Sequence, residues 1–343
     1  MSVLFVTNHV PPDRRGAFAA LHARVPIELA LFGGRSHHAT VGVEDPGVPH
    51  RHVAQRELFG LAASGSYRAV VCGTAGRLAL PGSYAGARRS ATPFVLWSAL
   101  WAQPRSPAHR AGALLLSRIY RDADAVVAYG PHVAAHARRR GARRVHVAPQ
   151  AVDQAFWSEP GIAPPHDGST FLFVGRPAPE KGVKELLQAW RVSGLSADGA
   201  RLELVGVEPA LAPGDEIVAH PAADPVALRN FYAAADVLVV PSVPSPTFRE
   251  PWGLVVNEAM HQGLPIIATD AVGAAAGGLV RHERNGLVVP AGDTDALAAA
   301  LRRMHQDPAS RRRMGLQARR DVAAFSFDAW ADGMAGALHF DRF

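Results

Sequence analysis

Short apolar runs alternate with longer amphipathic segments along the chain. This alternation predicts an α/β fold with parallel sheets. In the first half, strands are expected at residues 3–7, 69–72, 93–97, 125–128 and 145–148. In the second half, strands are expected at residues 171–174, 202–205, 237–240, 265–269 and 287–289. Helices are expected to begin at Gly16 and to cover residues 183–190, 226–235, 254–262, 295–304 and 327–338.

The strand pattern restarts near the middle of the chain, so we expect two doubly wound, Rossmann-like domains. The length of 343 residues, of which 48% are hydrophobic, also fits two cores better than one. We assign residues 1–152 to a first domain and 153–325 to a second. Residues 326–343 form an expected C-terminal helix, whose return to the first domain is left open. Because ligands of such sheets bind beyond the carboxyl ends of the strands, a cleft between the domains is the expected site.

Composition argues against several classes of protein, namely membrane-spanning, disulfide-bonded and nucleic-acid-binding proteins. No apolar run is long enough to span a bilayer, and the first residues predict a strand rather than a signal peptide. Cys72 is the only cysteine, which excludes an intramolecular disulfide and suits a reducing, cytoplasmic location. The formal net charge of +6 gives a weak attraction to anions, and no nucleic-acid-binding motif accompanies it. Nucleic acid is therefore not an expected partner.

The first candidate motif lies between an expected strand and an expected helix, at residues 174–182. It contains Arg176 and Lys181, and the only lysines among the 36 basic residues are Lys181 and Lys184. Two cations beside the N–H groups of a helix start would suit a diphosphate. The alternative is a solvated basic loop, and position alone does not decide between the two.

The second candidate motif, at residues 248–260, carries Glu250 in a loop and Glu258 one turn inside the following helix. Gly253 between them lets backbone approach a ligand closely. A carboxylate accepts hydrogen bonds from neighbouring hydroxyls, so both glutamates could face one cleft, one binding a ribose and the other a hexose. The alternative is a glutamate favoured by the helix dipole and an ordinary helical glutamate.

Together with several shorter motifs, this ordered set resembles the retaining GT-B glycosyltransferases of family 4. The matching residues are Gly175-Arg176, Lys181-Gly182, Leu204-Val205-Gly206, Tyr232-Ala233-Ala234-Ala235-Asp236-Val237, Pro241-Ser242, Glu250-Pro251, Gly253-Leu254, Glu258-Ala259, Gly263, Pro265 and Asn285-Gly286-Leu287-Val288. The resemblance covers the second half strongly and the first half weakly. It implies a hexosyltransferase with a GT-B fold, a nucleotide-diphosphate sugar as donor, and a hydroxyl-bearing small molecule, glycan or lipid as acceptor.

The resemblance also implies residue roles. Arg176 and Lys181 would neutralise the leaving diphosphate, as the catalytic cations. Glu258 would hold the nucleoside ribose, and Glu250 would contact the donor sugar. The remaining donor-binding residues would be Gly16, Gly175, Gly253, Leu254 and Val255.

The first half departs from the family pattern. Gly16, which would approach the diphosphate from the first loop, is followed by Ala17 where the family usually has a second glycine. In the second half, Trp252 stands where phenylalanine is frequent. Residues 94–101 lack the histidine that many members carry after a middle strand. The candidates left for the acceptor side are His9, Trp97, Trp101 and His109, each with a structural or core role as its alternative.

The expected mechanism follows from charge. Fixed cations aimed at the charge that grows on the departing diphosphate stabilise the transition state, so no metal and no cofactor are expected. The Asp-x-Asp sequence Asp122-Ala123-Asp124 is interpreted as a helix-to-strand junction rather than a metal site. The basic residues 138–144 are expected to end a helix. A solvated helix end and peripheral contact with the inner face of the membrane are both left open for this stretch.

Two other functions stay open at this stage. One is a nucleotide-sugar epimerase on the same fold, and the other is a non-catalytic protein that binds sugar nucleotides. An epimerase would convert a nucleotide sugar without an acceptor, and a binding protein would hold it without turnover.

Overall fold

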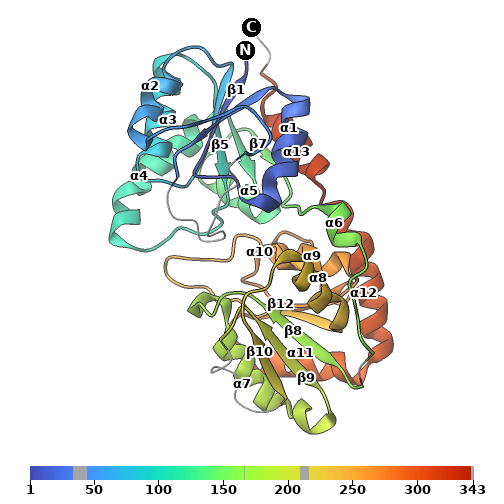
Figure 1. The fold of residues 1–343 in the computed structure, drawn as a ribbon. Coiled ribbons are helices and arrows are strands. Elements are labelled where there is room, and N and C mark those ends of the chain that lie inside the picture. The colour runs from blue at the N-terminus through green and yellow to red at the C-terminus, as the bar shows by residue number, and fades with distance from the viewer. Residues whose placement is uncertain (34–44, 166, 209–215, 341–343) are drawn as a thin grey trace. The chain divides into compact units, whose positions relative to one another are not determined.

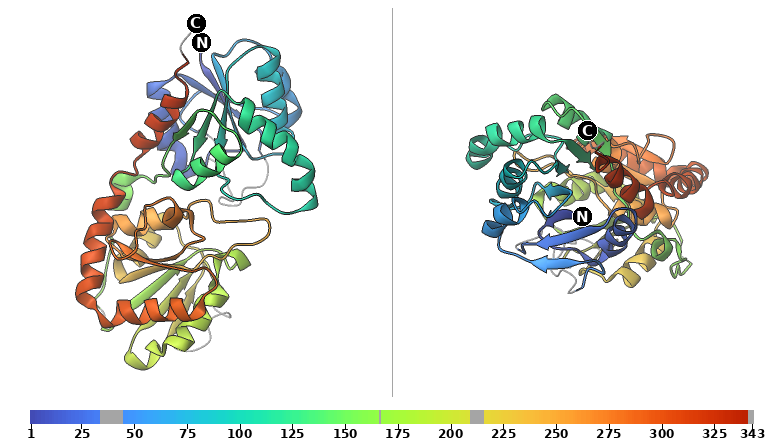
Figure 2. Two further views of the ribbon diagram at one scale, coloured as in Figure 1. Left: turned by 180° about the vertical axis from the view of Figure 1, so that it is seen from behind. Right: turned by 90° about the horizontal axis from the view of Figure 1, so that it is seen from above.

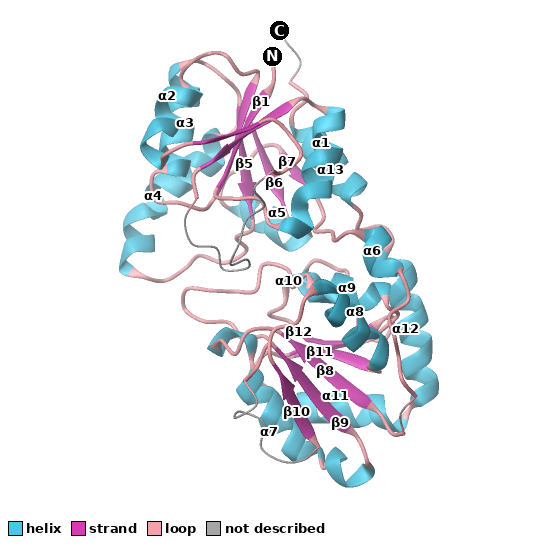
Figure 3. Cartoon of the chain, viewed as in Figure 1, coloured by secondary structure: helices cyan, strands magenta, loops and turns pink. Residues whose placement is uncertain are grey.

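The computed structural model describes residues 1–33, 45–165, 167–208 and 216–340. Contacts divide the chain into unit 1, which comprises Met1–Asp153 and Phe325–Phe343, and unit 2, which comprises Gln154–Ala324. Each unit is a parallel sheet with helices packed on its faces (Figure 1, Figure 3). No helix in the described part of the chain is both long enough and apolar enough to cross a bilayer.

Within the residues described for unit 1, the sheet has seven parallel strands in the order β3-β2-β1-β4-β5-β6-β7. The strands are β1 (Val3–Thr7), β2 (Ile27–Leu31), β3 (His50–His52), β4 (Ala69–Gly73), β5 (Phe94–Ser98), β6 (Ala125–Ala128) and β7 (Val145–Val147). The helices are α1 (Arg15–Arg24), α2 (Leu58–Ala62), α3 (Ala79–Arg89), α4 (Pro107–Asp122), α5 (Pro131–Arg139) and α13 (Phe327–Ala337), with 3-10 turns η1 (Pro12–Arg14) and η2 (Gln55–Glu57).

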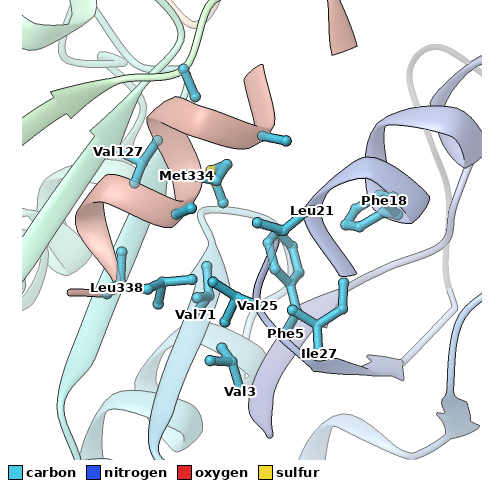
Figure 4. Close-up of a cluster of buried hydrophobic side chains, with 14 of the residues drawn as sticks. Val3, Phe5, Phe18, Leu21, Val25, Ile27, Val71, Val127, Met334 and Leu338 are labelled. Carbon is cyan, nitrogen blue, oxygen red and sulfur yellow. The ribbon is translucent and has the colours of Figure 1, made fainter. Parts of the chain in front are cut away.

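The side chains of β1 alternate between two cores, as the pleat of a strand requires. Val3 and Phe5 pack with α1 and α13 on one face of the sheet, whereas Leu4 and Val6 pack with α2, α3 and α4 on the other. Figure 4 shows the first of these cores, with Phe5 beside Leu21 of α1. Burial on both faces explains why β1 is a continuous apolar run rather than an alternating one.

The C-terminal helix α13 belongs to unit 1 although it follows unit 2 in the sequence. It lies beside α1 (Figure 2) and packs on β6 and β7. Arg24 of α1 bonds Asp328 at 2.8 Å and Asp332 at 2.5 Å. The two helices approach closely at Gly16, where a Cβ would lie 2.6 Å from the ring of Phe327. A larger residue at position 16 would therefore push the two helices apart.

Among the residues described for unit 2, six parallel strands form a sheet in the order β10-β9-β8-β11-β12-β13. The strands are β8 (Thr170–Val174), β9 (Arg201–Val205), β10 (Ile217–His220), β11 (Val237–Val240), β12 (Ile266–Thr269) and β13 (Gly286–Val289). The helices are α6 (Gln154–Ser158), α7 (Val183–Ser193), α8 (Pro225–Ala234), α9 (Val255–His261), α10 (Gly273–Ala276), α11 (Thr294–Gln306) and α12 (Pro308–Val322), with 3-10 turns η3 (Pro179–Lys181) and η4 (Leu195–Asp198).

Helices α7 and α11 cover one face of this sheet. The apolar stripe expected on α7 is confirmed, since Leu186 and Trp190 are buried in that core and Val183 and Leu187 pack against it. Helices α8 and α9 contact β8 and β11 respectively. Every strand expected from the sequence is present within one residue of its expected ends, and the parallel α/β class is confirmed.

Candidate functional site

Two motif loops of unit 2 meet at the point where its strand order reverses. The chain proceeds outward from β8 through β9 to β10 and then returns to the other side of β8 to form β11. The loop after β8 carries Arg176 and Lys181, and the loop after β11 carries Glu250. Open α/β sheets bind ligands beyond the carboxyl ends of the strands at such a reversal. Topology therefore places both motifs where a ligand site is expected.

Gly182 allows the loop after β8 to pack against the end of β11. Gly182 follows η3 with a φ of +72°, and a Cβ there would lie 2.0 Å from the carbonyl oxygen of Pro241, just beyond β11. Only glycine fits this left-handed conformation and close approach without strain. The backbone N–H of Val243 also donates to the carbonyl of Glu180 at 3.0 Å. These contacts hold the turn that carries Lys181 against the end of β11.

Lys181 and Glu250 form a buried ion pair. The Nζ atom of Lys181 donates to Oε2 of Glu250. The side chain of Glu250 is 3% exposed and that of Lys181 is 18% exposed, so the pair is largely withdrawn from water. A charge-assisted bond in such surroundings fixes both groups. The sequence analysis selected both residues but did not anticipate their contact.

Arg176 differs from Lys181 in its surroundings. Its side chain is 56% exposed, and its Nη2 atom lies 3.9 Å from Oε1 of Glu180. Such an exposed, long contact contributes little to stability. The first motif thus presents one solvated cation and one cation held by a buried carboxylate.

The loop from Glu250 to Leu254 is clamped by its backbone. Gly273 donates to the carbonyl of Glu250 at 3.1 Å, and Ala274 donates to that of Trp252 at 2.8 Å. The indole Nε1 of Trp252 donates to Oδ1 of the buried Asn257 at 2.7 Å. Trp252, noted in the sequence as a departure from phenylalanine, therefore adds a hydrogen bond that a phenylalanine ring cannot make.

Glu258 lies on α9 and has a partner that the sequence analysis missed. The hydroxyl of Tyr232, on α8, donates to Oε2 of Glu258 at 2.7 Å. Tyr232 is fully buried, whereas Glu258 is half-buried. Burial, followed by the charge of Glu258, raises the pKa of Tyr232 well above its usual range, so the phenol stays protonated. Tyr232 stood inside a quoted motif, but no spacing rule links it to a carboxylate on another helix.

That Glu250 and Glu258 face one cleft stays a prediction, but their partners are now defined. Each carboxylate belongs to a different hydrogen-bonded pair, Glu250 with Lys181 and Glu258 with Tyr232. The spacing of the two glutamates along the chain does not reveal these partners, because each partner lies on a distant segment.

Gly16 lies at the start of the helix that was expected to begin there, and its contact with a diphosphate stays a prediction. It is the second residue of α1, and its close approach is to Phe327 of α13. The ring of Phe327, in the same unit, therefore explains why a glycine stands at position 16. Gly175, in contrast, lies directly after β8 as expected, where a Cβ would lie 3.1 Å from the ring of Phe173.

The two tryptophans proposed for the acceptor side pack within unit 1. Trp97 of β5 contacts Phe5 and Trp330 edge-on, with ring centroids 5.5 and 6.1 Å apart. Trp101 meets the ring of His132 at 5.0 Å and packs on a small cluster near the end of β6. These contacts favour the core interpretation that the sequence analysis kept beside the stacking one.

The two candidate histidines lie in different surroundings. His9 follows β1 and is half-buried, and burial lowers its pKa, which favours the neutral imidazole. His109 is exposed in the first turn of α4, and its Nδ1 lies 2.6 Å from the hydroxyl of Ser106, the N-cap residue of that helix. A local capping contact therefore accounts for His109.

The Asp-x-Asp sequence lies at a helix-to-strand junction, as expected. Asp122 ends α4 and accepts from the hydroxyl of Tyr84 at 2.9 Å. Asp124 precedes β6, accepts from the backbone N–H of Phe94 at 2.8 Å and pairs with Arg88. No group of three or more potential metal ligands occurs among the described residues. The helix α5 ends at Arg139, which confirms that the basic residues begin at a helix end.

Comparison with known proteins bears on this part of the chain. Residues 168–307 match the family described as "Glycosyl transferases group 1". The matched range contains both motif loops and both ion-paired or hydrogen-bonded glutamates. The segment that forms the candidate site is thus similar to a glycosyltransferase family.

Several curated relatives are also named as glycosyltransferases. A D-inositol 3-phosphate glycosyltransferase of Kineococcus radiotolerans is 33% identical over 237 residues, covering 55% of this chain and 50% of the relative. One of Streptomyces avermitilis is 33% identical over 193 residues, covering 50% of this chain and 39% of the relative. The chain therefore matches about half or less of the length of these relatives.

Solved structures extend the likeness to the whole chain. Sucrose-phosphate synthase from Thermosynechococcus elongatus has a TM-score of 0.74 at 22% identity, covering 98% of each chain. Anabaena Alr3699/HepE in complex with UDP has a TM-score of 0.76 at 17% identity, covering 98% of this chain and 99% of the other. At these identities the likeness concerns the fold, which is GT-B.

Proposed function

We propose that this protein is a retaining glycosyltransferase that moves a hexose from a nucleotide-diphosphate sugar to an acceptor hydroxyl. The observation that supports it most is the Lys181–Glu250 pair at the strand-order reversal of a glycosyltransferase group 1 domain. A buried cation held at the carboxyl edge of a parallel sheet suits a leaving group that gains negative charge.

In this proposal the diphosphate binds Arg176 and Lys181, beside Gly175 and the first turn of α7. The guanidinium offers a fork of donors to phosphate oxygens, and the ammonium offers a compact charge. Glu258 accepts hydrogen bonds from the ribose. The backbone around Gly253, Leu254 and Val255 completes the donor contacts.

The pairing of Lys181 with Glu250 gives these two residues a role before the donor arrives. The two opposite charges compensate each other, so neither charge is left unpaired where little water reaches it. When the donor binds, the ammonium turns to the diphosphate and the carboxylate turns to the sugar hydroxyls. One pair of contacts thereby replaces another, which reduces the desolvation cost of forming the complex.

The proposed reaction breaks the bond between the anomeric carbon and the diphosphate oxygen, and the electron pair stays on that oxygen. The acceptor hydroxyl attacks from the same face, forms the new bond to carbon and gives its proton to the departing phosphate. Lys181 and Arg176 stabilise the charge that grows on the diphosphate in the transition state. The proposal assigns no step to a metal, so chelation with EDTA is expected to leave the rate unchanged.

The test is a turnover assay with purified protein, UDP-, GDP-, ADP- and TDP-linked hexoses and a panel of acceptors. Since relatives are named for D-inositol 3-phosphate and a similar structure was solved with UDP, UDP-sugars with inositol phosphates and sugar phosphates come first. The expected result is acceptor-dependent release of the nucleoside diphosphate, with the anomeric configuration retained in the product by NMR.

Two other outcomes would replace the proposal. Conversion of a nucleotide sugar into its epimer without an acceptor would identify an epimerase. Tight donor binding without turnover across the panel would identify a sugar-nucleotide binding protein. Lys181→Ala and Glu258→Ala should each abolish transfer in folded protein, and full activity in both variants would contradict the donor-site assignment.

A further inference from the structure

The hydrogen bond between Tyr232 and Glu258 joins two helices of unit 2. The hydroxyl of Tyr232, on α8, donates to Oε2 of Glu258, on α9, at 2.7 Å. The ring of Tyr232 is fully buried and meets the ring of Trp157 edge-on, with centroids 5.8 Å apart. The donor of the hydrogen bond is therefore enclosed by packing, while its acceptor, Glu258, is half-buried.

The helix that carries Tyr232 is held at its start and at its middle. Asp224 caps the start of α8 by accepting from Val226 and Ala227, both at 2.9 Å. Arg229 donates to the carbonyl of Phe156 at 3.0 Å and lies 4.6 Å over the Phe156 ring, which ties α8 to α6. The phenol is thus presented from a fixed position, and the more exposed carboxylate adjusts to it.

A bond of this kind sets the orientation of a carboxylate. A glutamate side chain has several rotatable bonds, and its two oxygens are interchangeable when nothing holds either of them. With Oε2 held by the phenol, the carboxylate plane and the direction of Oε1 are defined. Because the phenol keeps its proton, it donates this hydrogen bond and the carboxylate accepts it. A carboxylate oriented in this way is suited to accept hydrogen bonds from a diol.

We propose that Tyr232 is a positioning residue that orients Glu258 toward the ribose diol of the donor and thereby makes the site selective for ribonucleotides. This inference rests on the proposed function, since it takes a nucleoside diphosphate as the ligand of unit 2. Tyr232 is too deeply buried to touch the ligand itself, so it acts through Glu258.

The chain offers a matched control for a merely structural role. Tyr67 in unit 1 is 7% exposed and donates from its hydroxyl to Oε2 of Glu28 at 2.9 Å. Tyr67→Phe and Tyr232→Phe thus each remove one hydroxyl from a tyrosine–glutamate hydrogen bond and keep the ring. Losses of thermal stability should be similar in the two variants, so stability alone does not distinguish the roles.

The experiment measures binding by calorimetry for the wild type and both variants. The probes are UDP, GDP and ADP, each paired with its 2′,3′-dideoxy analogue, together with dTDP. In the wild type, the preferred nucleotide should bind about tenfold more tightly than its dideoxy analogue, as expected for hydrogen bonds to a charged group. Tyr232→Phe should reduce that ratio about fivefold or more and leave dideoxy binding within about twofold. Tyr67→Phe should keep the wild-type ratio.

Each other result overturns the inference in an identifiable way. If the wild type binds none of the probes, the proposed function fails and the inference fails with it. If the wild type binds a nucleotide but does not distinguish it from its dideoxy analogue, or binds dTDP alone, the diol assignment is wrong while the proposed function stands. If Tyr232→Phe keeps the wild-type ratio, or weakens both ligands equally, Tyr232 does not position Glu258.

Discussion

The ion pair between Lys181 and Glu250 allows a quantitative test that needs no substrate. Lys181→Met keeps a long apolar side chain and removes the ammonium, and Glu250→Gln keeps the shape of the carboxylate and removes its charge. The double variant Lys181→Met/Glu250→Gln removes both charges together. Lys184→Met serves as the control, because Lys184 is the other lysine of the chain and is exposed on α7.

The expected magnitudes follow from burial. Glu250 is 3% exposed, so removing its cation should cost about 3 kcal/mol, at the lower end of values for broken buried pairs. Lys181 is 18% exposed on a flexible stem that can reach water, so Glu250→Gln should cost less, about 2 kcal/mol. The double variant leaves no uncompensated charge and should lose less than the sum, with a coupling energy of about 2 kcal/mol. Lys184→Met should stay within about 0.5 kcal/mol of the wild type.

The assay is equilibrium unfolding in urea, followed by tryptophan fluorescence, to which Trp157, Trp190 and Trp252 of unit 2 contribute. The free energies of unfolding of the wild type, the two single variants and the double variant complete a double-mutant cycle. Lys184→Met is the control outside this cycle. A coupling energy near zero, or a Lys181→Met variant as stable as Lys184→Met, would refute the pair as described. It would also remove the reason to regard Lys181 as a cation held in place for a diphosphate.

Gly182 and Gly194 flank α7 with the same φ of 72°. Gly182→Ala would place a Cβ 2.0 Å from a carbonyl oxygen and should lower the free energy of unfolding by about 3 kcal/mol or more. Gly194→Ala, with no described atom within 4 Å, should lower it by only about 1 kcal/mol. Equal losses in urea unfolding would contradict the close approach. Burial, with a smaller effect of a nearby arginine, lowers the pKa of His261 to about 4. Since the unfolded chain then takes up a proton first, His261 should account for about 2 kcal/mol of the stability lost between pH 7 and pH 5, and His261→Gln should remove that part of the slope in pH-dependent unfolding. Trp252→Phe should lower the free energy of unfolding by about 1 kcal/mol through loss of the bond to Asn257, which a melting curve with an unchanged midpoint would refute.

The strands were predictable where both faces of the sheet are covered, because such strands are continuous apolar runs. The edge strands β3 and β10 were not predicted. β3 is His50–His52, three residues of polar character that pair with β2 at the end of the described strand order. β2, whose apolar run contains Glu28, was also passed over. Helix α12 was missed because its buried face is narrow: beside the two large apolar residues, Met314 and Val322, it holds small or polar ones such as Ser310 and Ala318.

The site was predictable as a set of residues but not as a set of contacts. Lys181 was selected as a cation between a strand and a helix, and Glu250 as a carboxylate in a loop before a helix. The strand order places β8 and β11, which precede these loops, side by side. The separation of 69 positions between Lys181 and Glu250 carries no information about pairing. Tyr232 lies 26 positions from Glu258, and the contact depends on how α8 packs beside α9. Such tertiary packing is what a single sequence leaves undetermined.

The crystal structure of the protein with the nucleoside diphosphate that raises its melting temperature most tests the central proposal directly. The account predicts that the diphosphate lies within hydrogen-bonding distance of Lys181 Nζ and that the ribose hydroxyls contact the carboxylate of Glu258. A nucleotide bound away from the carboxyl ends of β8 and β11, with Lys181 still bonded to Glu250, would contradict it.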